Sequence, residues 1–91
     1  MANRHASAIK RNRQNEKRRL RNRAIRSKVR SEVRKVREAV SSKDAGAAAT
    51  ELKTAIKELS KAATKGVLHK NAAARRIGRL SKQVAALQRG A

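Results

Sequence analysis

The sequence has no phenylalanine, tyrosine or tryptophan among its 91 residues. Modules that read single-stranded RNA on a β-sheet stack the bases on aromatic side chains, so this absence excludes that class of RNA-binding protein. Cysteine is also absent, and the two histidines, His5 and His69, stand isolated in the chain. The composition therefore excludes thiol chemistry and disulfides, and neither a zinc site, an iron site nor any other cofactor is expected.

Proline is missing as well, and glycine occurs only four times, so long helices meet few strong breakers. No apolar run approaches the length of a membrane span, and the N-terminus lacks the apolar stretch of a signal peptide. A cytoplasmic location without membrane association is the simple expectation. The six acidic residues are scattered without a paired spacing, which offers no acid-base mechanism and argues against an enzyme.

Positive charge dominates what is present, because 26 Lys and Arg face 6 Asp and Glu, for a net charge of +20. Such a chain repels itself unless a polyanion neutralises it, so its partner should be nucleic acid or an anionic membrane surface. The core must be thin, since 18 residues are Ala and only 16 are Ile, Leu or Val. We therefore expect a marginal fold that its partner completes.

Hydrophobic spacing predicts three helices, over about residues 7–40, 44–65 and 71–89. In the second half of the first helix, apolar residues recur every three or four positions, which is typical of an amphipathic helix. These residues are Ile25, Val29, Val33, Val36 and Val40. Further upstream Arg11 and Arg18 occupy the same arc, so the apolar stripe ends near Ile25.

The two connections carry helix-capping residues. Ser41 to Asp44 supplies side-chain oxygens that can cap the second helix, and Gly66 can close that helix in the left-handed conformation. Asn71 is a good cap for the third helix. Helices joined by short turns pack antiparallel, which predicts an all-α, up-down-up three-helix bundle forming a single domain over residues 1–91. Since the first helix would reach about 50 Å against about 30 Å for the others, its basic N-terminal part must overhang the bundle.

The overhanging stretch carries basic side chains all around the helix instead of along one face. This arrangement suits insertion among several phosphate backbones, because each charge finds a partner only if polyanion lies on every side. The residues expected to contact RNA in the first helix are Lys10, Arg11, Arg13, Lys17, Arg18, Arg19, Arg21, Asn22, Arg23, Arg26, Lys28 and Arg30. Glu16 and Glu32 are expected to pair with arginines one turn away.

The second connection has two interpretations. In one, His69 only packs or hydrogen-bonds in the turn while Asn71 caps the third helix. In the other, a second RNA contact forms here, helped by the positive N-terminus of the third helix. The candidate residues for that contact are His69, Lys70, Asn71, Arg75 and Arg76.

Other classes of basic protein fit less well or stay open. The string Arg21-Asn22-Arg23-Ala24 superficially resembles the basic region of DNA-binding zippers, but the small residues after the asparagine and the leucine heptad are missing. A membrane-active helix would need bulky apolar residues opposite its charge. A DNA-compacting protein and a regulator that docks on an acidic enzyme surface remain alternatives. Competition between structured RNA and duplex DNA separates the first of them.

Four strings in the sequence are distinctive. They are Ala2-Asn3, Ser7-Ala8-Ile9-Lys10-Arg11, Glu16-Lys17-Arg18-Arg19-Leu20-Arg21-Asn22, and Lys65-Gly66-Val67-Leu68-His69-Lys70-Asn71 with Ala73-Ala74-Arg75 after it. With them, nearly the whole chain resembles the bacterial small-subunit ribosomal protein S20 family. The resemblance implies a structural protein of the small ribosomal subunit that binds its RNA directly and stabilises folding and assembly. It further implies contacts to the 5′ region of that RNA and to the long helix near its 3′ end. No homo-oligomer is expected.

Overall fold

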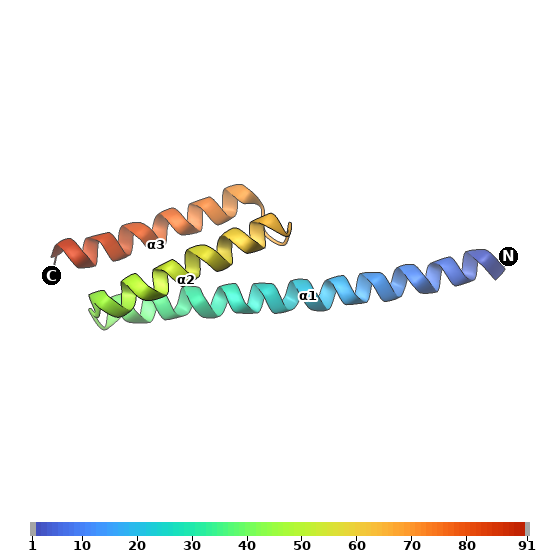
Figure 1. The fold of residues 1–91 in the computed structure, drawn as a ribbon, viewed down its shortest axis with the longest axis horizontal. Coiled ribbons are helices and arrows are strands. Elements are labelled where there is room, and N and C mark those ends of the chain that lie inside the picture. The colour runs from blue at the N-terminus through green and yellow to red at the C-terminus, as the bar shows by residue number, and fades with distance from the viewer. Residues whose placement is uncertain (1, 91) are drawn as a thin grey trace.

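The computed structural model describes the backbone of residues 2–90 and the side chains of residues 8–90, and it contains three α-helices (Figure 1). Helix α1 covers Ala2–Ser41, α2 covers Ala45–Thr64 and α3 covers Lys70–Gly90. No strand occurs among residues 2–90. The predicted all-α class is confirmed. No helix in the described part is long and apolar enough to cross a membrane.

The three helices run up, down and up, and α2 packs against both of the others (Figure 1). The first half of α1 continues alone beyond the bundle, which makes the molecule 69 Å long but only 21 and 14 Å across. The predicted overhang of a long basic first helix is therefore confirmed. It follows from helix length alone, because α1 has 40 residues where α2 and α3 have 20 and 21.

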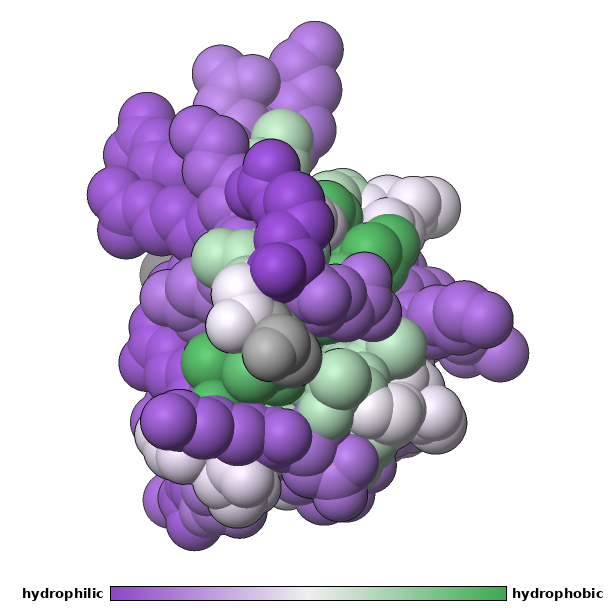
Figure 2. All heavy atoms as spheres, turned by 90° about the vertical axis from the view of Figure 1, so that its left-hand side faces the viewer, coloured by the Kyte–Doolittle hydropathy of each residue, from purple (hydrophilic) through white to green (hydrophobic). Residues whose placement is uncertain are grey.

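Alanine, valine and leucine fill a thin core. On α2, Ala48, Ala55 and Ala62 are fully buried, and their small side chains let the neighbouring helices approach closely. The larger core residues are Val29, Val36, Leu59, Leu80 and Val84. Figure 2 views the bundle from the end opposite the overhang and shows apolar side chains enclosed by hydrophilic ones. The buried residues of α1 all lie at or after Val29. The core therefore stabilises the bundle and does not stabilise the overhang.

The apolar stripe of α1 ends where the sequence predicts. Val29 is only 2% exposed and Ile25 is partly buried against the core, whereas the residues from Ala8 to Arg21 are all exposed. Asn22 is the last partly buried residue on this side, and its Oδ1 has no hydrogen-bond partner in the described part of the chain. The overhang therefore begins just upstream of Asn22.

The connection between α1 and α2 reverses the chain with backbone hydrogen bonds. The N–H of Lys43 donates to Val40 at 3.1 Å and the N–H of Asp44 to Ala39 at 3.0 Å, with Lys43 at a φ of 57°. This is the Schellman arrangement that satisfies the last carbonyls of a helix. The Oδ1 of Asp44 then accepts from the N–H of Ala47 at 3.0 Å and caps α2, as predicted.

The connection between α2 and α3 has the same Schellman arrangement. One prediction about it was wrong. Gly66, at a φ of 76°, ends α2, and buried Val67 follows it. Helix α3 begins at Lys70, so Asn71 lies inside its first turn and is not its cap. His69 caps it instead, because its Nδ1 accepts from the N–H of Asn71 at 3.1 Å.

Candidate nucleic-acid interface

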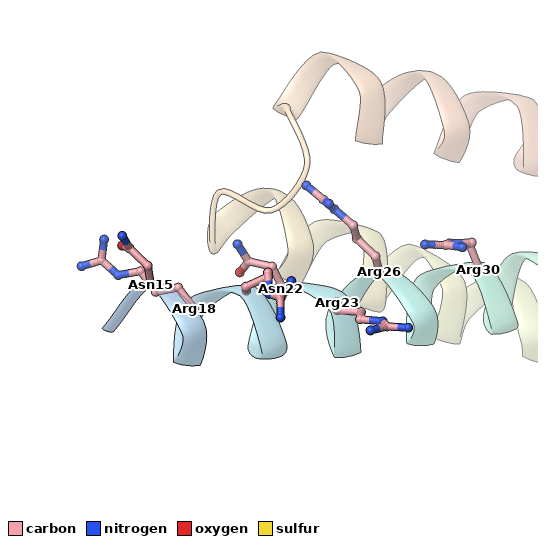
Figure 3. A pocket seen from close by; sticks show the side chains of 7 residues that line it. Asn15, Arg18, Asn22, Arg23, Arg26 and Arg30 are labelled. Atoms are coloured by element: carbon pink, nitrogen blue, oxygen red, sulfur yellow. The ribbon is translucent and has the colours of Figure 1, made fainter. Parts of the chain in front are cut away.

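A concave surface lies in the corner where α1 leaves the bundle, close to the connection between α2 and α3 (Figure 3). It encloses about 450 Å³. We call it the corner, and its lining residues are Asn15, Arg18, Arg19, Asn22, Arg23, Arg26 and Arg30. Most of them recur every three or four residues, which places them on one side of α1. In Figure 3, Arg26 extends toward the connection between α2 and α3.

The corner holds positive charge that the described part of the chain leaves almost uncompensated. Arg19 alone of its five arginines has an ion pair there, to Glu16 at 2.7 Å on the exposed side of the overhang. The other four have neither an ion pair nor a side-chain hydrogen bond within residues 8–90. A guanidinium presents its donors in a planar fork that matches the oxygens of a phosphate. The corner thus presents donors whose geometry matches the oxygens of a polyanion.

The rest of the predicted set on the overhang does not join this surface. All of these side chains are exposed. All except Arg11, which shares the arc of Arg18 two turns further from the bundle, lie on other sides of α1. They are Lys10, Arg11, Arg13, Lys17 and Arg21. Lys28, further along α1, spans to α2 and pairs with Glu58 at 3.5 Å. Its ammonium therefore has a partner within the protein, unlike most of the arginines.

The two predicted glutamate pairs turned out differently. Glu16 pairs with Arg19 one turn away, as expected. Glu32 is 9% exposed, and its partner is Lys35 at 3.3 Å instead of an arginine. The prediction for Glu32 was wrong, because the residues one turn later are Lys35 and Val36 and neither is an arginine. Its burial against α2 was not foreseen.

The second predicted cluster lies at the start of α3. His69, Lys70, Asn71 and Arg75 are all exposed. Because Nδ1 of His69 accepts a hydrogen bond, the ring proton belongs on Nε2, which stays available as a donor. The capping role of His69 and a contact with a phosphate are therefore compatible. Arg76 does not belong to this cluster, since it faces a groove between α1 and α3.

That groove contains three arginines that the sequence analysis missed. Arg34 and Arg37 line it from α1, and Arg79 lines it from α3. One signal was present in the sequence, because no arginine lies between Glu38 and Ala74 although lysines do. The net charge does not distinguish Lys from Arg, so it gives no sign of this segregation.

The fold and these surfaces define a strongly basic α-helical bundle with concave arginine-lined faces, a class suited to polyanionic partners. Comparison with known proteins specifies the family. The sequence model of the family described as "Ribosomal protein S20" matches residues 2–85, and the chain belongs to this family. The resemblance found in the sequence strings is thereby confirmed.

Several curated relatives carry the name "Small ribosomal subunit protein bS20". The relative from Anaeromyxobacter sp. (strain K) is 56% identical over 80 residues, covering 88% of this chain and 88% of the relative. The one from Geobacter metallireducens is 50% identical, covering 88% and 92%. The one from Syntrophobacter fumaroxidans is 47% identical over 87 residues, covering 96% and 100%. These names denote components of the small ribosomal subunit and no enzyme.

Proposed function

We propose that this chain is a structural protein of the small ribosomal subunit that binds the subunit's RNA directly. In this proposal it stabilises RNA folding and assembly by neutralising charge between RNA segments. The observation that carries the proposal is the corner, where five arginines gather on one concave surface without an acidic residue among its lining. Membership of the ribosomal protein S20 family supports the choice of partner.

The role of the overhang follows from the side of α1 that faces the core in the bundle and continues into the overhang. From Ile25 onward that arc carries Ile and Val, which pack against α2 and α3. Upstream it carries Asn22 and Arg18, and both of them line the corner. An RNA backbone placed in the corner would replace the missing protein core as the packing partner of α1. Release of condensed counterions from the RNA would supply much of the binding free energy.

Recognition of this kind depends on shape and charge more than on base sequence. The deep, narrow major groove of A-form RNA keeps side chains from reading base edges, so a basic helix contacts phosphates and sugars. The exposed start of α3 would add donors at the other side of the corner, through Lys70 and Nε2 of His69. The positive end of the α3 dipole favours phosphate there. We infer contacts to the 5′ region of the RNA and to the long helix near its 3′ end from the family alone.

A charge-matched pair of variants tests the proposal. In the corner variant, Arg18, Arg19, Arg23 and Arg26 are changed to Ala. In the control variant, Lys53, Lys57, Lys61 and Lys82 are changed to Ala. Both variants lose the same charge, and all four control lysines are exposed and lie outside both arginine-lined surfaces. Filter binding to in vitro transcribed small-subunit ribosomal RNA is measured over a range of salt concentrations.

The corner variant should lose most of its affinity, and the slope of log affinity against log salt should fall by about 3, as expected for four lost phosphate contacts. The control variant should change much less. Equal affinity of the two variants would refute the corner as the binding surface. Equal affinity of the wild type for ribosomal RNA and duplex DNA at the same salt would favour a DNA-compacting protein, and binding to an acidic enzyme that survives nuclease treatment would favour the regulator.

A further inference from the structure

A second concave surface lies between α1 and α3. It encloses about 580 Å³, and we call it the α1–α3 groove. Its arginines are Arg30, Arg34 and Arg37 on one wall and Arg76 and Arg79 on the other. Val33 and Leu80 lie between the two walls, and Leu80 is 2% exposed. The walls therefore stand on the packed core of the bundle, whereas the corner stands half on the overhang.

Charge in the α1–α3 groove has no counterpart within residues 8–90. None of its five arginines takes part in an ion pair or a side-chain hydrogen bond there, and no acidic residue lines it. Two acids lie near these arginines in sequence. Glu32 pairs with Lys35 at 3.3 Å, and Glu38, next to Arg37, has no ion pair within residues 8–90 and does not line the groove. Like charges on facing walls repel each other, which agrees with the sparse contact between α1 and α3.

The kind of cation also distinguishes this groove from an ordinary solvated surface. Helix α2 carries four exposed or capping cations, Lys53, Lys57, Lys61 and Lys65, and no arginine. The α1–α3 groove and the corner are lined by arginine and by no lysine. Lysine is a strongly hydrated point charge that keeps a surface soluble, while arginine is less hydrated and binds phosphate through two donors at once. The distribution separates solubilising charge from binding charge.

We propose that the α1–α3 groove is a second phosphate-binding site, which holds one RNA backbone strand between its two arginine walls. The proposal rests on the proposed function, because it takes RNA as the polyanion. Arg30 lines both surfaces, so the corner and the groove form one track along α1. From Arg18 to Arg37 this track is about 28 Å long at 1.5 Å per residue. In this proposal the protein contacts RNA at two adjacent places, one on the core of the bundle and one where the overhang begins.

The experiment compares three proteins on full-length small-subunit ribosomal RNA by hydroxyl-radical footprinting and by binding at several salt concentrations. In the groove variant, Arg34, Arg37, Arg76 and Arg79 are changed to Gln, which keeps side-chain length and helix propensity. The corner variant and the lysine control variant described above complete the set. All four groove arginines are exposed, so helix content by circular dichroism should match the wild type. If the fourfold variant unfolds, Arg37→Gln with Arg79→Gln takes its place.

The groove variant should lose one set of protected nucleotides and keep the set that the corner variant loses. Its salt slope should fall by about 3, in proportion to the phosphate contacts removed. A groove variant with the footprint and affinity of the lysine control would overturn the second site. In that case a wild type that still prefers ribosomal RNA over duplex DNA, and still depends on the corner, would leave the proposed function standing.

Discussion

The two halves of α1 belong to one continuous helix and both are rich in Arg and Lys, yet only one of them packs against the other helices. The half from Ile25 to Ser41 places Val29 and Val36 into the core, and they are 2% and 0% exposed. The half upstream presents Asn22 and Arg18 on the same arc and has no helix beside it (Figure 1). Even Leu20, a good core residue elsewhere, stays 55% exposed there. The difference shows that the side chains on one arc, apolar in the bundle and polar upstream, decide which part of α1 packs against other helices.

The largest expected effect on stability comes from exchanging apolar and basic residues along this arc. Val29→Arg would bury an unpaired guanidinium and should destabilise the bundle by about 3–5 kcal/mol, enough to unfold a thin core. Arg18→Val changes an exposed residue on the same arc and should alter stability by less than about 0.5 kcal/mol. Urea unfolding followed by circular dichroism measures both. Similar losses in the two variants would show that the overhang contributes to the folded core.

Hydrogen exchange should separate the two halves residue by residue. Amides of the bundled half should be protected by a factor on the order of 10³, while those of residues 8–21 should exchange within about tenfold of the unfolded rate. The physical reason is that an isolated helix lacks tertiary packing to oppose fraying. Adding ribosomal RNA should slow exchange mainly in the overhang. Strong protection of the overhang in the free protein would contradict ordering by the partner.

The smallest effect concerns His69, which caps α3 within the bundle. His69→Ala removes the cap of α3 and should cost about 1 kcal/mol of stability, whereas Asn is a good cap and His69→Asn should cost only a few tenths. Asn has no donor at the position of Nε2, so both variants should bind RNA more weakly if that group contacts a phosphate. Recovery of both stability and RNA affinity in His69→Asn would confine His69 to its capping role.

Much of the fold could be predicted because it depends on local patterns. The spacing of Val29, Val33 and Val36 fixed the buried side of α1, and Asp44 and Gly66 marked a helix start and a helix end. The cap of α3 was missed because Asn71 is the better capping residue by type. His69 takes the role because the backbone of the preceding turn brings its ring to the first turn of the helix.

The candidate site could be predicted only in part. The corner follows from α1 alone, since Arg19, Arg26 and Arg30 share one side of a single helix. The α1–α3 groove joins Arg34 and Arg37 to Arg79 across more than forty positions, and no local pattern reports such a distance. That every predicted RNA contact occurs in the complex stays a prediction, including those of Lys10, Lys17 and the other exposed residues around the overhang.

By itself the sequence determined the helices, the place where the apolar stripe ends and the excess of positive charge. These are properties of spacing and composition, which act along the chain. Only the tertiary structure decided which arginines face each other. It did so because α2 takes up most of the packing of both neighbours and leaves α1 and α3 apart, with Arg34 and Arg79 on opposite walls of an open groove.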